Sequence, residues 1–455
     1  MGEMTARETA LRVLHRLDES DLFADWALDS ALRRSHLQRR DRALVTELVN
    51  GVLRWRKYLD GVLDYLLKGT RTAGLTSWIR NILRIGLYQI LFLDKIPPAV
   101  ATHESVSLAK KFGHTGTASL VNAVLRNAIK AGRIETFYPP LAKDPVGHIG
   151  MRYSHPDWMV RRWLERYGQE DTIALCLANN QVPGVVVRVN PLKTTVDRLK
   201  ENLRSEGLKV DNGSLVPGYL HLKRVGDIRR LEAFRQGWFQ VQDESAGLSL
   251  LLLAPEPGEV ILDLCSAPGG KTAHIAGLMG DRGLILAVDR HKRRLKDLVD
   301  NCHRLGISSA RPLVADGKNL WVQPVDRVLV DAPCSGLGVL ARRVDLRWGK
   351  KDEDIPRLAQ LQLQLLMTGA NVLKPGGVLV YSTCTIEDQE NEEVVASLLF
   401  QRDDLRLESA TSFVPAETVT EKGFVRTFPH RDGLDGTFAA RLRKLKRGYF
   451  PWTKS

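Results

Sequence analysis

From residue 260 onward, short apolar segments alternate with longer segments of helical character, and this alternation limits the fold more than any other feature. The apolar segments are VILDL, GLILAVD, RPLVAD, DRVLVD and GVLVYST, which end at residues 264, 289, 316, 331 and 383. Helical segments are expected from residues 271, 291, 355 and 387. Such a rhythm is typical of a doubly wound parallel sheet with crossover helices. We therefore predict an α/β domain at residues 246–455.

The first 130 residues show a different pattern, with apolar residues at helical spacing, as in Leu44, Leu48 and Val52. We expect helices over residues 41–67, 76–93, 101–112 and 117–129, separated by Gly and Pro breakers. This predicts an all-helical domain at residues 1–135. A segment rich in Pro and Gly at 136–150 indicates a linker, and residues 151–245 a small α+β subdomain, with a helix over 156–168 and a strand over 184–190.

The composition excludes several classes of protein. Hydrophobic residues make up 44% and charged residues 26% of the 455, which is ordinary for a globular protein and excludes disordered and collagen-like chains. The longest apolar runs, such as residues 248–255, are too short to span a bilayer, and the first 20 residues lack the apolar core of a secretory signal. We therefore expect a cytoplasmic protein with no membrane partner.

The net charge of +13 favours a polyanionic partner, because surface Lys and Arg attract phosphates. Residues 1–140 hold 21 Lys and Arg against 14 Asp and Glu, more than half of the total surplus. A solvated basic surface explains these numbers equally well, so the charge alone leaves both readings open.

The five cysteines are scattered, and none belongs to a CxxC pair. This pattern argues against a disulfide framework and against a structural zinc site, so each cysteine is expected to be a free thiol and no metal is expected. For Cys176, Cys265 and Cys302 we predict the common role of a small buried hydrophobic residue.

The segments that follow the first three strands indicate a cofactor site, because ligands of open parallel sheets bind beyond the carboxyl ends of the strands. The loop after the first strand holds Cys265, Ser266, Ala267, Pro268, Gly269, Gly270 and Lys271. Its glycines let the backbone approach a ligand, and the following helix offers free N–H groups. Asp289 lies 20 residues after Gly269, where such folds place the carboxylate that binds ribose, and Asp316 ends the third strand as a candidate for the adenine edge.

Each of these pieces also occurs as a plain turn or helix cap. Together, in register, they predict an adenosine-type cofactor. The loop matches neither GxGxxG nor GxxxxGK[ST], so the usual fingerprints of a dinucleotide and of a nucleoside triphosphate are missing.

Two cysteines follow the fourth and fifth strands. Cys334 lies in DAPCSG, three residues after Asp331, and Cys384 lies in YSTCT. Both are therefore expected at the same edge of the sheet, beside the cofactor. Helix N-termini or nearby cations would favour their thiolates, which is how nucleophilic cysteines are activated.

The motifs LDLCSAPGGKT, DAPCSG, LKPGG and YSTCT resemble those of the RNA 5-methylcytosine methyltransferases, the family that includes the bacterial Sun protein and Nop2-like enzymes. The likeness covers nearly the whole chain, including RVNPLKT at 188–194 and GWFQVQDESA at 237–246. ALRVL, IPPAVATHESVSLAKKF and SLVNAVLR resemble the NusB-like RNA-binding domain that precedes bacterial Sun-type rRNA methyltransferases. A departure is Ser266, where many relatives have alanine, and a small residue still fits the turn.

The resemblance implies a Rossmann-like sheet that uses S-adenosylmethionine, with the loop at 265–271 around its methionine and ribose, Asp289 on the ribose hydroxyls, Asp316 near the adenine and Asp331 beside the methyl group. It implies RNA as the partner, with 16S rRNA as the first choice and 23S rRNA or tRNA as the alternative. No DNA partner is expected, and we expect a monomer.

The resemblance also implies a mechanism. Thiolate attack at carbon 6 of cytosine makes carbon 5 nucleophilic, and Cys384 is implied to be that nucleophile. Cys334 is implied to help remove the carbon 5 proton or to allow product release. Asp331 would stabilise the N3 edge of the base, as a protonated acid or through hydrogen bonds.

The basic residues Arg342, Arg343 and Arg347, with Trp348, are candidates for holding flanking nucleotides, and an exposed solvated loop is the alternative.

Three rival functions fit the sequence less well. A DNA cytosine methyltransferase needs no second cysteine, and a dehydrogenase needs the missing glycine fingerprint. An RNA-binding factor that has lost catalysis would not need both cysteines.

Overall fold

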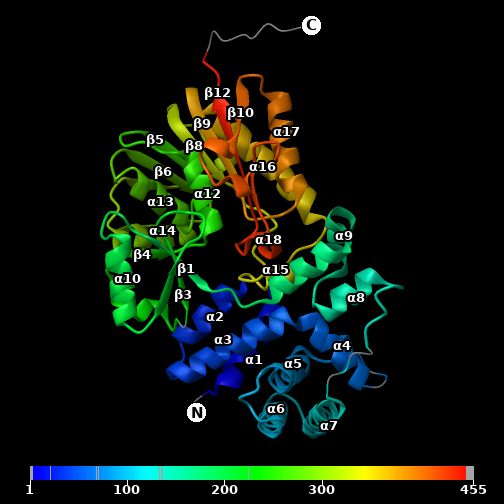
Figure 1. Ribbon diagram of the computed structural model, residues 1–455. Coiled ribbons are helices and arrows are strands. Elements are labelled where there is room, and N and C mark those ends of the chain that lie inside the picture. The colour runs from blue at the N-terminus through cyan, green and yellow to red at the C-terminus, as the bar shows by residue number, and fades with distance from the viewer. Residues whose placement is uncertain are drawn as a thin grey trace. The chain divides into compact units, whose positions relative to one another are not determined.

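The computed structural model describes residues 4–446, except 21, 68, 70, 133, 135, 136 and 224 (Figure 1). The chain forms two compact units. The helical unit comprises Met1–Gln181 and Leu340–Asp352, and the catalytic unit comprises Val182–Val339 and Glu353–Ser455. A short segment that follows the Cys334 motif therefore belongs to the helical unit.

The described part of the helical unit consists of helices joined by short turns. They are α1 Ala6–Asp18, α2 Ala24–Arg33, α3 Arg39–Arg54, α4 Arg56–Leu66, α5 Ser77–Phe92, α6 Pro98–Phe112, α7 Thr115–Ala131, α8 Pro145–Arg152, α9 Asp157–Asn180 and α15 Leu346–Gly349, with a 3₁₀ turn at Thr72–Gly74. Their apolar faces form one core around Leu11, Leu48, Leu63, Ile82 and Leu125, to which Val344 of the inserted segment also belongs.

Three boundaries differ from the sequence prediction. The expected helix over 41–67 divides at Trp55 into α3 and α4. The expected helix over 156–168 continues to Asn180, with a kink at Gly168, whose φ of 75° ordinary helical residues avoid. Residues 145–150 of the predicted linker belong to the helix α8, because Asp144 caps the first turn through Gly147 and Pro145 fits the first position of a helix. The predicted border at 135 and 136 lies outside the described residues.

The catalytic unit begins with a small antiparallel sheet. Its strands are β1 Val185–Val189, β2 Lys209–Asn212, β3 Tyr219–Lys223 and β4 Phe239–Val241, in the order β2-β3-β1-β4. The helices α10 Val196–Ser205 and α11 Glu232–Arg235 accompany it. Val187, Leu199, Leu222 and Phe239 form its core. The predicted strand over 184–190 corresponds to β1.

The large sheet has the order β10-β12-β9-β8-β5-β6-β7, and β11 pairs with β12. Its strands are β5 Val260–Leu264, β6 Leu284–Asp289, β7 Ala310–Val314, β8 Val325–Asp331, β9 Leu373–Thr383, β10 Leu405–Glu408, β11 Val425–Thr427 and β12 Thr437–Lys444. The five strands from β5 to β9 are parallel, and β12 pairs antiparallel with β9. The predicted parallel α/β sheet is confirmed; the antiparallel edge was not predicted.

Helices cover both faces of this sheet (Figure 1). Ile261 and Leu329 point to the face where α12 Glu244–Leu253 and α13 Gly270–Leu278 pack, and α14 Lys292–Leu305 packs against β6 and β7. Leu262 and Val330 point to the other face, where α16 Asp354–Asn371 and α17 Glu392–Gln401 pack. Strand order reverses beside β5, which lies between β6 and β8, so the carboxyl ends of β5, β8 and β9 bound the expected binding edge.

The helices of the described chain are each too short or too polar to cross a membrane.

Candidate active site

Cys334 and Cys384 lie together at the carboxyl ends of neighbouring parallel strands. The register of β8 and β9 pairs Asp331 with Ser382, so the loops that follow these strands start side by side. The two sulfur atoms are 3.3 Å apart, and the side chain of Cys384 is exposed. All five cysteines are free thiols, as the sequence predicted.

The pair has one thiol that holds its proton tightly. The hydrogen bond with Cys384, burial and the negative charge of Glu390 raise the pKa of Cys334 well above its ordinary value. Cys334 therefore remains protonated and can donate a hydrogen bond to the Cys384 sulfur. Of the two sulfurs, that of Cys384 is the one exposed to solvent.

The thiols of the other three cysteines are hard to deprotonate. Burial raises the pKa of Cys176 to about 12, that of Cys265 to about 12 and that of Cys302 to about 11. These values fit the predicted role of small hydrophobic side chains.

Lys271 connects the three strand ends that surround the cysteines. Its ammonium contacts a carboxylate oxygen of Asp331 and donates to Ser382 Oγ at 2.8 Å. Lys271 is the second residue of α13, the helix that follows β5; Asp331 is the last residue of β8, and Ser382 is the last but one of β9. These contacts hold the Asp331 carboxyl at the end of β8.

A cavity lies at the ends of β5, β6 and β7, with an empty volume of about 520 Å³ that includes space open to solvent. Among the predicted cofactor residues, Cys265, Asp289 and Asp316 line it. Leu361 and Leu365 supply an apolar wall, and Arg290, His291 and Arg294 a basic one. An elongated ligand with an apolar ring, hydroxyls and a carboxylate matches this lining, so the residues fit S-adenosylmethionine.

Asp289 is held firmly. One of its carboxylate oxygens accepts from the His291 backbone N–H at 2.8 Å and the other from that of Ala267 at 3.3 Å. The residue is only 5% exposed. Asp316 is more open and accepts from the Lys318 N–H at 3.1 Å. Both acids thus cap the turns that follow their strands, while each also faces the cavity.

The remaining loop residues shape the turn and do not line the cavity. Gly269 has φ of 99°, and a Cβ there would meet Leu298 Cγ at 2.8 Å, so this position requires glycine. At Gly270 a Cβ would have room. Ser266 donates to the Val288 carbonyl through both its N–H and its hydroxyl. The cavity lining also omits Ala267, Pro268, Lys271 and Asp331.

Behind the loop lies Asp263, a carboxyl that the sequence analysis did not single out. It is fully buried, one of its oxygens accepts from Thr272 Oγ1 at 2.6 Å, and the other has no hydrogen-bond partner. Burial raises the pKa of Asp263 to about 7, although the Thr272 hydroxyl opposes this shift.

The prediction that Arg347 holds a nucleotide is wrong. Arg347 is fully buried in the helical unit, where its guanidinium donates to the backbone carbonyls of Arg54, Ser154 and Asn179 and to the side chain of Asn180, at 2.6 to 3.2 Å. The indole of Trp348 donates to the Leu53 carbonyl at 2.7 Å.

Arg343 forms ion pairs with Asp25 and Asp345 in the same unit. The basic run after the Cys334 motif therefore packs with the helices.

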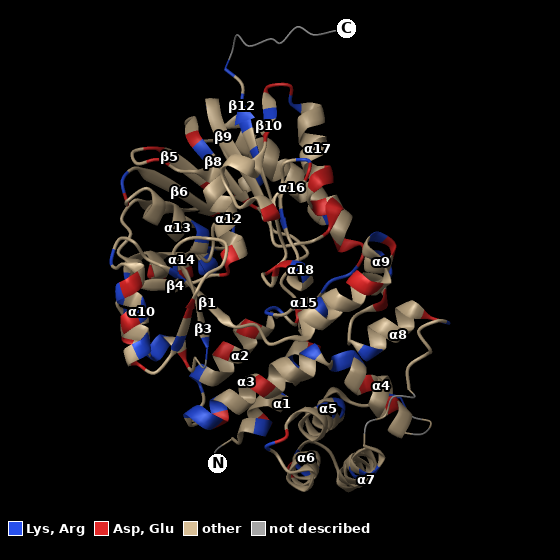
Figure 2. Ribbon diagram, viewed as in Figure 1, with Lys and Arg blue, Asp and Glu red and all other residues tan. Residues whose placement is uncertain are grey.

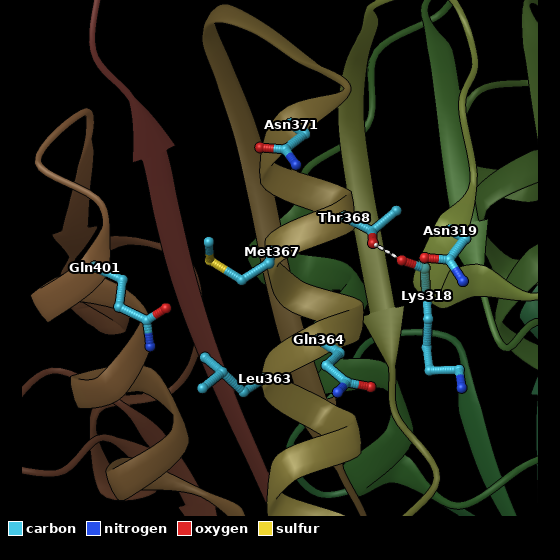
Figure 3. Close-up of a pocket in the computed structure, with 8 residues that line it drawn as sticks. All are labelled: Lys318, Asn319, Leu363, Gln364, Met367, Thr368, Asn371 and Gln401. Atoms are coloured by element: carbon cyan, nitrogen blue, oxygen red, sulfur yellow. Dashed lines mark hydrogen bonds between the residues drawn. The ribbon is translucent and has the colours of Figure 1, made fainter.

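Two further features of the surface help to delimit the site. A larger cavity lies between α16, α17 and the 3₁₀ turn Gly317–Asn319, where the Thr368 hydroxyl donates to the Lys318 carbonyl at 2.6 Å (Figure 3). It contains none of the predicted site residues. Lys and Arg residues are spread over both units of the chain (Figure 2). Among the described residues, no cluster of His, Cys, Asp or Glu is arranged to hold a metal ion.

Comparison with known proteins places these features in a family. The model of the family described as 16S rRNA methyltransferase RsmB/F matches residues 250–443, that of the NusB family residues 4–130, and that of a ferredoxin-like domain of RsmF/B-like methyltransferases residues 155–229. The probable ribosomal RNA small subunit methyltransferase B of Bacillus subtilis is 36% identical over 98% of this chain and 100% of its own length. Its namesake from Synechocystis is 38% identical over 97% of this chain and its own full length.

Solved structures are also similar to this chain. PH0851 superposes with a TM-score of 0.82 at 27% identity, covering 96% of this chain and 98% of its own. A methyltransferase homolog from Pyrococcus horikoshii has a TM-score of 0.58 at 30% identity, covering 66% of this chain and 99% of its own. The sheet, its cofactor edge and these likenesses define a methyltransferase. The chain belongs to the 16S rRNA methyltransferase RsmB/F family, with the NusB and ferredoxin-like domains matched in front of its methyltransferase domain.

Proposed function

We propose that this protein methylates carbon 5 of one cytosine in 16S rRNA, with S-adenosylmethionine as the methyl donor and Cys384 as a covalent nucleophile. The observation that carries the proposal is the pair of free sulfurs 3.3 Å apart at the ends of β8 and β9. The names of the relatives support small-subunit rRNA as the substrate. Another RNA, such as 23S rRNA or tRNA, is the alternative.

The first step needs a nucleophile, because carbon 5 of cytosine is unreactive in an aromatic ring. The exposed Cys384 sulfur forms a bond to carbon 6, the ring electrons move towards carbon 5, and N3 takes up the proton that the thiol has lost. Cys334, which remains protonated, donates to the Cys384 sulfur and favours its thiolate before the attack. The cofactor supplies an electrophilic methyl group, which carbon 5 can then accept.

Asp331 stabilises the adduct. Its carboxylate, held by Lys271, accepts a hydrogen bond from the protonated N3 of the base. Because Lys271 also binds Ser382, the acceptor keeps its place at the end of β8.

The last step restores the aromatic ring. The proton on carbon 5 leaves to solvent, the bond from carbon 6 to sulfur breaks, and the departing Cys384 sulfur takes back the proton that N3 had accepted. Cys334 lies beside this bond, its sulfur 3.3 Å from that of Cys384, and helps to remove the carbon 5 proton or to release the product.

The cofactor would lie in the cavity at the ends of β5, β6 and β7. Asp289 would bind the ribose hydroxyls, Asp316 the adenine amino group, and Leu361 and Leu365 would pack on the adenine ring. The loop at 265–271 would surround the methionine part. This arrangement places the donor on the same sheet edge as the two cysteines.

Covalent trapping tests the roles of the cysteines. Wild-type protein, Cys384→Ala, Cys334→Ala and the double variant are incubated with rRNA and S-adenosylmethionine, and denaturing electrophoresis reports protein–RNA adducts. Cys384→Ala should show neither methylation nor adduct. Cys334→Ala should accumulate an adduct that disappears in the double variant, because elimination is impaired while attack is intact.

Cys302→Ala, a buried thiol outside the site, serves as the matched control and should turn over without accumulating adduct. If the adduct persists in Cys384→Ala and vanishes in Cys334→Ala, the two roles are inverted. Methylation of RNA by the wild-type protein also separates the proposal from a binding factor without catalysis.

A further inference from the structure

A fully buried carboxylate connects the two loops that carry the cysteines. Glu390 ends the 3₁₀ turn Asp388–Glu390, shortly after Cys384, and is 0% exposed. One carboxylate oxygen accepts from the Ser335 backbone N–H at 2.8 Å, and the other accepts from the Ser335 hydroxyl. Ser335 directly follows Cys334, so the carboxylate holds the chain on one side of that cysteine.

The network also reaches the other loop. The hydroxyls of Ser335 and Thr385 share a hydrogen bond of 2.7 Å, and Thr385 directly follows Cys384. The amide of Gln362, on α16, donates to Glu390 at 2.9 Å and to the Pro333 carbonyl at 3.0 Å. The residues on both sides of Cys334, and the residue after Cys384, are thereby tied to one carboxylate.

No cation balances this charge within the described part of the chain. The partners of the Glu390 carboxylate are a backbone N–H, hydroxyls and an amide. Burial raises the pKa of Glu390, and these donors oppose that shift. Burying an unpaired carboxyl is costly, and a neutral side chain of similar size would fill the same space. The acid is therefore better explained by the three hydrogen bonds that its carboxylate accepts than by packing.

We propose that Glu390 is a positioning residue that sets the separation of the Cys334 and Cys384 sulfurs through Ser335 and Thr385. The hydrogen bonds of Glu390 go to the neighbours of the two cysteines, and its charge acts on Cys334 through space. The geometric part of this inference stands on the network alone, and its consequence for methylation rests on the proposed function.

Disulfide trapping measures the geometry without any substrate. Diamide oxidises two adjacent thiols to a disulfide, taking up their two hydrogens and two electrons, and peptide mass spectrometry follows the Cys334–Cys384 bond over time. In Glu390→Gln the amide nitrogen cannot accept from Ser335, so the trapping rate should fall about 10-fold or more, as for the loss of a charge-assisted hydrogen bond. Glu392→Gln is the matched control, because Glu392 lies two residues on and pairs with Lys422 and Arg426 at the surface. It should trap at the wild-type rate.

Catalysis gives the second readout. In Glu390→Gln, kcat should fall while KM for RNA and for S-adenosylmethionine stay at wild-type values, since the binding surfaces are unchanged. If Glu390→Gln is folded by circular dichroism and traps as fast as Glu392→Gln, the inference is overturned. If it does not fold, Ser335→Ala removes the hydroxyl link alone and must slow trapping in the same way.

The positioning role and the proposed function can be rejected independently of each other. Slow trapping in Glu390→Gln together with a wild-type protein that makes no 5-methylcytidine would retain the positioning role and reject the proposed function. Equal trapping rates in Glu390→Gln and Glu392→Gln, together with normal formation of 5-methylcytidine by the wild-type protein, would reject the positioning role and retain the proposed function.

Discussion

Each of the two units buries a charged side chain whose hydrogen-bond partners among the described residues are neutral, and the two units use this arrangement differently. In the helical unit, Arg347 donates to three backbone carbonyls and one amide, and burial lowers its pKa to about 9. In the catalytic unit, Glu390 accepts from a backbone N–H, a hydroxyl and an amide. Both are fully buried.

The acceptors of Arg347 come from segments around residues 54, 154 and 180, far apart in the sequence. The donors to Glu390 are Ser335, which follows Cys334, and Gln362 on α16. The same physical device, a buried charge satisfied by neutral dipoles, therefore joins whole helices in one unit and adjusts a pair of thiols in the other. Loss of Arg347 should reduce stability, whereas loss of Glu390 should reduce turnover.

The largest expected effect on stability is that of Arg347→Met. Removing the guanidinium leaves several buried acceptors without donors, so the free energy of unfolding of the helical unit should fall by about 3 to 5 kcal/mol. Urea unfolding measures it. Arg33→Met, which breaks an exposed ion pair with Asp29, is the control and should cost at most about 1 kcal/mol. Equal midpoints for the two variants would refute the structural role of Arg347.

Asp263 should make the catalytic unit less stable as the pH rises. Its pKa is about 7 in the folded protein, above the ordinary value of 3.8. Between about pH 4 and pH 7 the unfolded chain loses this proton while the folded protein keeps it, so stability falls across this window, by up to about 4 kcal/mol. Asp263→Asn should remove that fall. Parallel stability curves of wild type and variant from pH 4.5 to 8 would contradict the assignment.

Asp289→Ala should weaken binding of S-adenosylmethionine by about 1.5 to 3 kcal/mol, because the ribose hydroxyls lose a charge-assisted hydrogen bond. Isothermal calorimetry measures the affinity. Asp297→Ala, an exposed acid on the next helix, is the control. If Asp289→Ala binds S-adenosylmethionine with unchanged affinity, the ribose hydroxyls do not bind to Asp289.

The smallest effects per residue should come from exposed cations. Lys110, Arg126 and Lys130 in the helical unit, like Lys292, Arg293 and Lys296 on α14, are exposed and pair with no described acid. Changing either triple to Gln should weaken RNA binding and flatten its salt dependence by about 0.7 to 0.9 for each phosphate that is no longer neutralised.

If the triple variant in the helical unit changes neither the affinity for RNA nor its salt dependence, the positive surplus of residues 1–140 does not contribute to RNA binding. Substitutions are preferable to deleting residues 1–140, which would also remove the Arg54 carbonyl that Arg347 binds.

Much of the fold follows from local patterns. Alternating apolar segments located β5 to β9, and the spacing of the two motifs located Cys334 and Cys384 at adjacent strand ends, because parallel strands share one carboxyl edge. The antiparallel strands β10 to β12 were missed, as was α8, whose Pro and Gly are also common in linkers.

The errors at the site have a common cause. Arg347 stands in a basic run that is typical of an exposed loop, and only tertiary contacts show that the residue is buried. Glu390 stands among acids at 387–393, and nothing local separates it from Asp388, Glu392 and Glu393, which are more exposed. Asp263 and Lys271 lie inside a motif that the sequence associates with the cofactor, yet their partners, Thr272, Asp331 and Ser382, are fixed by the register of the sheet.

The most direct test of the central claim is the identity of the methylated nucleoside. Purified protein is incubated with small-subunit rRNA and isotopically labelled S-adenosylmethionine, and the RNA is digested to nucleosides for mass spectrometry. We predict labelled 5-methylcytidine with wild-type protein and none with Cys384→Ala. Label in N4-methylcytidine or in a 2′-O-methylated nucleoside, or full labelling of cytidine carbon 5 by Cys384→Ala, would contradict it.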